Sequence, residues 1–407
     1  MLSYRFRWVF CQLDTLQHCF PTNLRQFLNE LPETLDETYE RILKGIKKAQ
    51  KDDARRLLQC LAVAVRPLRV EEVAELLSFD FQTSGSGGIP KLKEGWRWDD
   101  QEEAVLSTCS SLVAVVPYGG SRVVQFSHFS VKEYLTSPRL ARSHEDVSCF
   151  HIDLEAAHTI LAQACLGTLL RLDEHTDNSD TRALPLVEYA ARHWADHARF
   201  EKVSSRIQDG MDDLFDTSQP HFAAWLRVHD MDEFWSSFSS EKRRGGGSPL
   251  YYAAICGFYD LAERLIMKHP EQVNTAGGRI VAPLPAALYK RHFHIATLLH
   301  RHGSAIDVRD DMGKPLLCAS VFGRVDVMRW LLNHGADVNS RYESYGGARW
   351  TALHNAAANE YLEVARLLLS HGASVDEKDA NGRTAFQVAH GPEMMKLLLD
   401  HRASPEP

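Results

Sequence analysis

The last third of the chain contains the stretch KPLLCASVFGRVDVMRWLLNHGADVN at residues 314–339, and TALHNAAANEYLEVARLLLSHGASVD follows at residues 351–376. The two stretches agree closely along their length, and three weaker copies lie on either side of them. Equivalent positions in the five copies are Pro249, Pro283, Pro315, Ala352 and Ala385. Their separations of 34, 32, 37 and 33 residues indicate a repeat array with a period of about 33 residues.

The five copies resemble ankyrin repeats, which share this threonine, proline, leucine and histidine start, the paired alanines and the leucine triplet before a glycine. Pro283 and Pro315 suit the first turn of a helix, where the missing N–H has no partner in any case. Gly303, Gly335 and Gly372 follow the predicted second helices, where a left-handed backbone ends a helix at little cost. The residues after Gly335 are expected to begin a hairpin.

Two sets of residues are expected to form the core of the array. The small side chains that let neighbouring first helices approach are Ala253, Ala254, Ala287, Ala356 and Ala357. The leucines that fill the space between layers are Leu265, Leu298, Leu331, Leu332, Leu367 and Leu368. Five repeats, spanning 249–404, exceed the minimum of about three that stacking requires. The fifth repeat is shorter by about three residues and is expected to be an atypical terminal cap.

Two different segments precede the array. The sequence EKRRGGGS at residues 241–248 is charged and glycine-rich, which favours a flexible joint. Residues 141–240 are predicted to be an α-helical connector, because their apolar residues recur at spacings of three and four. Clear examples are Ala156, Ile160, Leu161, Ala164 and Cys165, and later Leu186, Tyr189, Ala190, Trp194 and His197.

Residues 51–140 combine helical and strand patterns. Helices are predicted at Arg55–Val65, Val70–Leu77 and Gln101–Thr108. Two β-branched runs, Leu112–Val116 and Val123–Phe126, flank the sequence PYGGS, whose glycines favour a tight hairpin. A closing helix is expected to begin at Ser130, with Ser130 and Glu133 as a capping box, and to stop at Pro138. This order predicts a winged helix within a mostly α-helical chain.

Long runs upstream of the repeats resemble fungal NACHT and ankyrin proteins. The runs are FRWVFCQLDTLQHCFPTNLRQFLNELPETLDETYERIL at 6–43, RPLRVEEVAELLSFDF at 66–81, QFSHFSVKEYLTS at 125–137 and LPLVEYAARHWADHARF at 184–200. The resemblance implies a winged helix like that of GPI inositol-deacylases, within the class of signal-transducing STAND NTPases. It also implies contact with a NACHT domain, in the same chain or in another.

The chain departs from that family because it has no phosphate-binding loop of the form G-x-x-x-x-G-K-[ST]. Gly313-Lys314 is followed by Pro315 inside a repeat, and the glycines near Gly87 lack the lysine and the hydroxyl. Residues 1–50 are therefore interpreted as remnant helices that follow a NACHT domain. The apolar stripe over the first twenty residues either covers the winged helix or, as the resemblance favours, belonged to a nucleotide-binding domain missing from this chain.

Composition sets further limits. The formal charge of -8 offers no general attraction to nucleic acid or acidic lipid. The eight cysteines form no C-x-x-C pair, which suits a reducing compartment. A long apolar run, Leu57–Val65, is far shorter than the roughly 18 residues of a membrane span. The sequence predicts a cytoplasmic protein with no membrane partner.

No catalytic, metal or cofactor site is expected. His193 and His197 are four residues apart, but Trp194 stands where a metalloprotease has glutamate, so a packed helix is favoured over a metal site. Ser127, His128 and Ser130 lack an orienting acid and a nucleophile elbow, so Ser130 is interpreted as a helix cap.

Winged helices often bind DNA, so the local charge is informative. Residues 54–138 contain nine Lys and Arg against ten Asp and Glu, a sum of -1, and Glu71, Glu72 and Glu75 fall on the predicted second helix. Because phosphate contacts dominate affinity for DNA, a nucleic-acid partner is disfavoured, although DNA binding stays a third hypothesis.

The repeat array offers the strongest functional surface, because its hairpin tips and inner helices are not needed for stacking. Position-matching to the family points to Tyr252, Asp311, Met312, Lys314 and Arg383 as contacts for a protein partner. The fourth repeat adds the insertion RYESYGGARW, which contributes Tyr342, Tyr345, Arg349 and Trp350 near one tip. Aromatic and Arg residues carry much of the energy of interfaces, so this cluster is the predicted hot spot. The alternative is a tolerated hairpin in which Trp350 packs on its own repeat.

The function predicted from these features is a non-catalytic interaction module or receptor scaffold. The alternative is the regulatory C-terminal part of a STAND NTPase.

Overall fold

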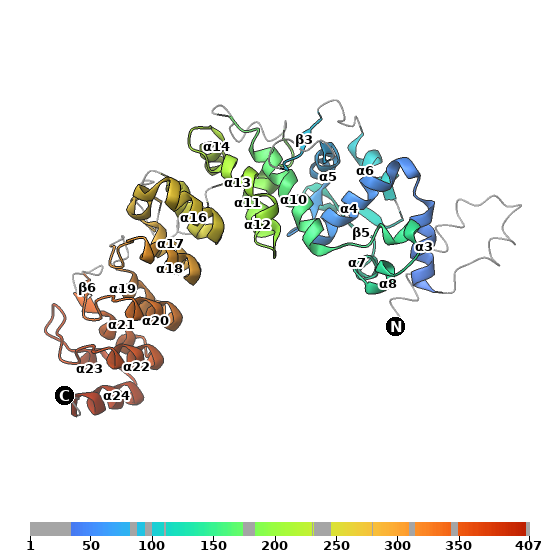
Figure 1. Ribbon diagram of the computed structural model, residues 1–407. Coiled ribbons are helices and arrows are strands. Elements are labelled where there is room, and N and C mark those ends of the chain that lie inside the picture. The colour runs from blue at the N-terminus through green and yellow to red at the C-terminus, as the bar shows by residue number, and fades with distance from the viewer. Residues whose placement is uncertain are drawn as a thin grey trace, which may run out of the picture. The chain divides into compact units, whose positions relative to one another are not determined.

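The computed structural model describes residues 34–81, 88–93, 100–109, 111–173, 184–229, 231, 246–278, 280–308, 314–342 and 349–403. The chain divides into two compact units, Met1–Met231 and Asp232–Pro407, which are considered separately below (Figure 1). The predicted fold class is confirmed, since helices predominate and the few strands form small sheets. The stripe expected in the first twenty residues lies outside the described residues, as do positions 241–245 of the predicted joint.

The first unit begins with a winged helix. Its helices are α3 Leu35–Gly45, α4 Lys51–Val63, α5 Val70–Leu77, α6 Gln101–Cys109 and α7 Phe129–Leu135, followed by α8 Pro138–Ala141 and α9 Glu145–Ser148. Its antiparallel sheet has the order β1-β5-β4, from β1 Leu68–Arg69, β5 Ser121–Phe126 and β4 Val113–Tyr118. A short pair, β2 Phe79–Asp80 and β3 Lys91–Leu92, follows α5. A 3-10 turn, η2 Lys48–Gln50, precedes α4.

The predicted hairpin is confirmed. Gly119 and Gly120 have φ angles of 56° and 86°, the left-handed backbone that a two-residue hairpin turn requires. Val115 pairs with Val124, and Val113 and Val124 are buried, so the β-branched runs hold this sheet against the helices.

The predicted capping box of the closing helix is wrong. Helix α7 begins at Phe129, and the ring of His128 accepts the N–H of Ser130 in place of the expected serine cap. Ser130 itself is buried, and its hydroxyl lies 2.7 Å from the Tyr39 hydroxyl and 2.6 Å from His128 Nδ1. Tyr39 comes from α3, so only the tertiary contact reveals what Ser130 does.

The connector follows the winged helix within the same unit. Its helices are α10 Leu154–Leu169, α11 Val187–Ala198, α12 Val203–Arg206, α13 Gln208–Leu214 and α14 His221–Val228. Asp153 caps α10 by accepting the N–H of Ala156 at 2.8 Å. Trp194 and Trp225 pack edge to face in the core, and Trp225 Nε1 donates to the Ala191 carbonyl at 3.0 Å.

The second unit is the stack of five repeats (Figure 1). Its helix pairs are α15 Pro249–Cys256 with α16 Tyr259–Lys268, α17 Pro283–Tyr289 with α18 Phe293–Arg301, α19 Pro315–Val321 with α20 Val325–Asn333, α21 Ala352–Ala358 with α22 Leu362–Ser370, and α23 Ala385–Val388 with α24 Pro392–Ala403. A 3-10 turn, η6 Pro270–Asn274, links the first two pairs. The short β6 Arg341–Tyr342 and β7 Trp350–Thr351 form a hairpin in the fourth repeat.

The physical expectations for the array are confirmed. Pro249, Pro283 and Pro315 are the first residues of α15, α17 and α19. The alanines and leucines predicted to fill the core are buried. Gly335 and Gly372 have φ angles of 92° and 84°, so they end the second helices in the left-handed region.

Candidate partner-binding surface

Two side chains at equivalent positions of the first helices link neighbouring repeats. The N–H of Ile280 donates to the Tyr251 hydroxyl at 3.2 Å, and His354 Nε2 donates to the Arg383 carbonyl at 3.0 Å. Both bonds reach main chain 29 residues further along. Burial lowers the pKa of His354, although the bond to the Arg383 carbonyl opposes that shift, and a neutral ring fits this bonding.

Two asparagines provide a second kind of link. Asn274 Nδ2 donates to the Gly303 carbonyl at 3.0 Å and its Oδ1 accepts the N–H of Ala305 at 3.0 Å. Asn339 repeats this arrangement with Gly372 at 3.3 Å and Ser374 at 2.9 Å. Each asparagine therefore fastens the main chain where the next repeat's second helix ends.

Asp379 organises the surface between the fourth and fifth repeats. Its side chain has 0% exposure, and Oδ1 accepts the N–H groups of Asn381 and Arg383, each at 2.8 Å. Oδ2 accepts from Arg383 Nε at 3.0 Å and from Trp350 Nε1 at 3.2 Å. Burial opposes the charged form, but these bonds, led by those from Arg383, outweigh it and lower the pKa of Asp379. We call Trp350, Asp379 and Arg383 the Asp379 cluster.

The Asp379 cluster joins two of the predicted contact residues. Trp350 is half-buried and bonds to the fifth repeat, whereas the guanidinium-bearing side chain of Arg383 keeps 46% of its surface exposed. Arg349 is exposed, with a left-handed φ of 49°, and Tyr342 pairs with Trp350 in the β6–β7 hairpin. The hairpin therefore holds both ends of the fourth-repeat insertion at this cluster.

The other predicted contacts are distributed differently. Lys314 is half-buried and forms an ion pair with Asp307 at 3.4 Å. Tyr252 is only 4% exposed and packs edge to face on Tyr251, so it offers little surface to a partner. Asp311, Met312 and Tyr345 lie outside the described residues. Sequence reasoning missed Asp379, although the Asp-x-Asn-Gly-Arg order at its turn was a signal for it.

A polar network inside the first unit accounts for the acids of α5. Glu72 is buried and accepts from Arg66 Nη2 at 2.7 Å and from Arg69 Nε at 3.0 Å. Buried Glu75 accepts the N–H of Leu186 at 2.6 Å, which fastens α5 to the connector. Two of the three acids that were expected to repel DNA are therefore internal, and the third, Glu71, is half-buried and lies 3.5 Å from Arg69 Nε.

The histidines of α11 also have structural partners. His193 Nδ1 lies 3.2 Å from Asp196 Oδ2. His197 is buried, with its nitrogens 2.9 Å from His158 Nδ1 and 2.9 Å from the Tyr189 hydroxyl. Burial, reinforced by the neighbouring His158, lowers the pKa of His197 to about 3. In the part of the chain that is described, no group of three or more His, Cys, Asp or Glu side chains is arranged to hold a metal.

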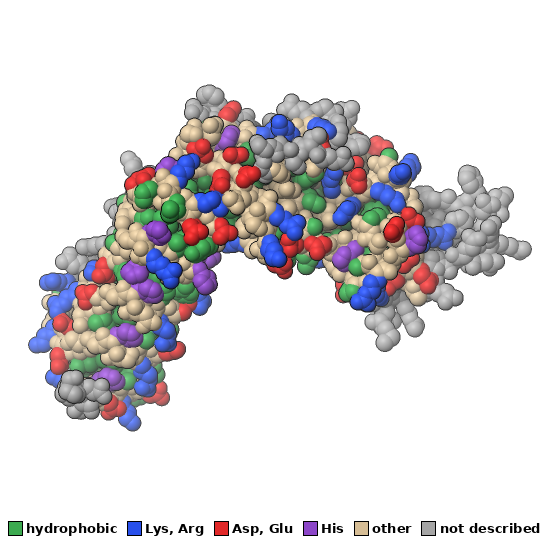
Figure 2. All heavy atoms as spheres, in the orientation of Figure 1, with side chains coloured by type: hydrophobic (Ala, Val, Ile, Leu, Met, Phe, Trp, Pro, Cys, Tyr) green, Lys and Arg blue, Asp and Glu red, His purple; other side chains and the backbone are tan. Residues whose placement is uncertain are grey.

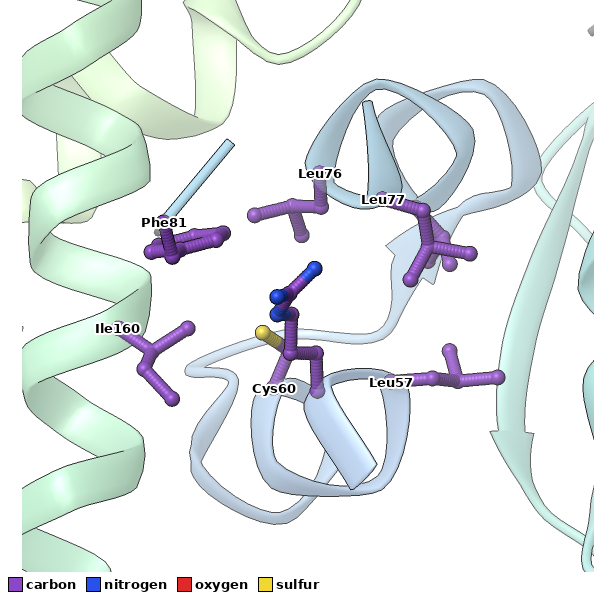
Figure 3. Close-up of a pocket in the computed structure, with 8 residues that line it drawn as sticks. Leu57, Cys60, Leu76, Leu77, Phe81 and Ile160 are labelled. Atoms are coloured by element: carbon purple, nitrogen blue, oxygen red, sulfur yellow. The ribbon is translucent and has the colours of Figure 1, made fainter. Parts of the chain in front are cut away.

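A small apolar hollow lies between α4, α5 and α10. Figure 3 shows Leu57, Cys60, Leu76, Leu77, Phe81 and Ile160 around it. The guanidinium of Arg56 lies over the Phe81 ring at 5.1 Å. The volume of about 10 Å³ is roughly that of one water molecule, so the hollow is a packing defect.

None of the described helices is long and apolar enough to cross a membrane.

Comparisons with known protein families agree with the winged helix of the first unit and the repeat array of the second. Residues 39–145 match the winged helix domain of GPI inositol-deacylase. Residues 316–369 match one description of ankyrin repeats, and residues 250–342 and 343–407 match another.

Relatives of this chain in sequence occur in several organisms. Azaphilone pigments biosynthesis cluster protein L of Monascus ruber is 29% identical over 298 residues, 69% of this chain and 61% of that protein. Ankyrin repeat and KH domain-containing protein mask-1 of Caenorhabditis elegans is 30% identical over 164 residues, 39% of this chain and 6% of that protein. Ankyrin repeat and SOCS box protein 11 of Homo sapiens is 29% identical over 127 residues, 31% of this chain and 38% of that protein. The chain therefore spans less than two thirds of each relative, and it combines a GPI-inositol-deacylase-type winged helix with ankyrin repeats.

Proposed function

We propose that this chain is a non-catalytic interaction module, a receptor or scaffold that binds a protein partner through its ankyrin repeats. The observation that carries the proposal is the Asp379 cluster, which fixes an exposed arginine and the base of an aromatic-rich insertion on a buried carboxylate. Fixing these groups before binding lowers the entropy lost when a partner docks. The insertion residues Tyr342 and Tyr345, with Arg349, Trp350 and Arg383, form the proposed contact surface. Its proposed location is the cytoplasm.

The test starts from a partner captured by crosslinking and then purified, so that its affinity for the whole chain is measured by calorimetry. Tyr345→Ala and Arg349→Ala are expected to weaken binding at least tenfold while the unfolding midpoint is retained; Arg349 is exposed, so truncating it is expected to cost little stability. Trp350→Phe removes the Nε1–H donor and one ring of the indole but keeps an aromatic side chain, so it serves as the control for Trp350→Ala. Unchanged affinity in both insertion variants contradicts this surface, and absence of any saturable protein partner contradicts the proposed function.

We propose as the second candidate that the chain is the regulatory C-terminal part of a STAND NTPase, with its ATP- or GTP-binding domain outside this chain. The match of residues 39–145 to a winged helix, followed by ankyrin repeats, supports this order of domains. The candidate implies contact between this chain and a NACHT domain. A phosphate-binding loop encoded in frame before Met1 is the expected finding, and calorimetry of this chain alone is expected to show no ATP or GTP binding.

DNA binding through the winged helix has the weakest support. Glu102 on α6 forms an ion pair with Arg122 on β5, so one basic side chain of the sheet is already neutralised. A gel-shift series across salt concentrations tests this candidate, since retention that falls steeply with salt indicates phosphate contacts.

A further inference from the structure

The ends of the first helices carry an exposed apolar pair in one repeat. Val321 and Phe322 are 41% and 47% exposed, and they directly precede the turn at Gly323. The equivalent residues of the first repeat, Ile255 and Cys256, are 3% and 1% exposed. In the second and fourth repeats the position of Phe322 is also exposed, but it carries the polar residues Lys290 and Asn359, so the third repeat presents an apolar side chain where those repeats present polar ones.

Two basic side chains lie near the ring of Tyr289, at the end of the first helix of the second repeat. Arg324 Nη1 donates to the Tyr289 carbonyl at 2.7 Å, and its guanidinium lies 4.5 Å from the centre of the Tyr289 ring. Lys290 is exposed, with Nζ 5.8 Å from the same ring. Tyr289 and Lys290 hold in the second repeat the positions that Val321 and Phe322 hold in the third. We call Tyr289, Lys290, Val321, Phe322 and Arg324 the junction surface.

The stretch of sequence that carries the junction surface favours an anionic ligand. Residues 280–329 contain seven Lys and Arg against four Asp and Glu, a sum of +3. Two of the acids form ion pairs, Asp307 with Lys314 and Asp326 with Arg291. Over α18, Figure 2 shows histidine, lysine and arginine side chains on the face that it presents.

The junction itself differs from its neighbours. The second repeat has Pro285 at the position where Tyr251 and His354 bond to the main chain of the next repeat. It has Asp307 at the position where an asparagine, such as Asn339, makes the other link. Side chains bridge the second and third repeats instead, through Arg324 to Tyr289 and through Trp330 Nε1 to Thr297 Oγ1 at 3.2 Å.

We infer that the junction surface binds an acidic segment of a protein partner, with an apolar side chain of that segment on Val321 and Phe322 and its carboxylates beside Lys290 and Arg324. The apolar pair supplies the buried contact, and the cations select against basic or neutral segments. The inference rests on the proposed function and names the chemistry of the partner. It uses a different surface from the Asp379 cluster.

The experiment selects peptides from a displayed library of random 12-residue sequences against the whole purified chain at low salt. Enriched peptides are expected to place Asp or Glu beside Leu, Ile, Phe or Trp. Synthetic copies are then titrated against Phe322→Ala, Lys290→Glu and, as the matched control, Met267→Ala. Met267 is 74% exposed on α16, so its removal deletes an exposed apolar side chain elsewhere on the array.

The expected result is a loss of at least tenfold in affinity for Phe322→Ala and for Lys290→Glu, with Met267→Ala unchanged and all three variants retaining the wild-type unfolding midpoint. Enrichment of basic or uncharged peptides, equal binding to Phe322→Ala, or no enrichment at all overturns the inference. The proposed function fails separately, since it depends on a saturable protein partner and on the insertion variants.

Discussion

Asn339 links the third repeat to the fourth through two hydrogen bonds. Replacing it with alanine should therefore weaken the contact between these repeats without changing the buried core. The change removes a donor to the Gly372 carbonyl at 3.3 Å and an acceptor for the Ser374 N–H at 2.9 Å. A hydrogen bond contributes about 0.5–1.5 kcal/mol net. Water replaces part of this at the exposed Gly372 contact, so we expect the free energy of unfolding to fall by about 1–2 kcal/mol.

Urea denaturation followed by circular dichroism measures this loss. With a slope of about 2 kcal/mol per molar urea, the midpoint should fall by about 0.5–1 M. Amide hydrogen exchange gives a local readout, because the Ser374 N–H loses its acceptor and should exchange faster than in the wild type. Asn359→Ala is the matched control, since Asn359 Nδ2 bonds only to Asn355 O of its own repeat at 2.9 Å. If Asn339→Ala keeps the wild-type midpoint and the wild-type exchange at Ser374, the link carries no stability and the reasoning is refuted.

Three further predictions follow from single contacts. Gly257→Ala should destabilise the protein more than Gly303→Ala. Both glycines have φ above 80°, which costs about 1–2 kcal/mol for a residue with a side chain, but of the two only Gly257 would place its new Cβ 2.7 Å from the His292 ring. Equal melting temperatures of the two variants would contradict this prediction. Glu75→Ala should lower the free energy of unfolding by about 1–3 kcal/mol, because the Leu186 N–H loses its buried acceptor. Glu75→Gln keeps an acceptor and should lower it less, and thermal melts of the two variants measure the difference. The pKa of His197 is about 3 in the folded chain and about 6.5 when unfolded, so the unfolded state binds the extra proton between these values. Stability due to His197 should therefore be complete above pH 6.5 and fall as the pH drops toward 3, and urea midpoints across this range should fall less steeply for His197→Gln.

Local patterns were enough to predict most elements because each pattern has a local cause. Helix α5 has the predicted bounds Val70–Leu77, and the PYGGS hairpin forms where two glycines take up left-handed angles. The repeat prolines and glycines occupy the predicted helix starts and ends. Each of these features depends on a few neighbouring residues, so the order of residues alone specifies it.

The candidate site was harder to predict because its contacts join residues far apart in the chain. Trp350 and Asp379 are 29 residues apart, and nothing in the insertion indicates that its tryptophan donates to a buried carboxylate. Ser130 looked like a helix cap from its neighbours, yet its hydroxyl contacts Tyr39, which is 91 residues away. Glu72 and Glu75 looked like surface acids, but their partners Arg66 and Leu186 allow them to be buried.

The amino-acid order determined the number of repeats, the winged-helix pattern and the absence of a phosphate-binding loop, since these depend on periodicity and spacing. Only the tertiary structure decided which side chains face solvent, because exposure depends on what a neighbouring repeat or helix covers. Val321 and Ile255 occupy equivalent positions with similar chemistry, yet one is exposed and the other is buried. Burial by distant parts of the chain is the reason that the binding chemistry could not be predicted from the repeats themselves.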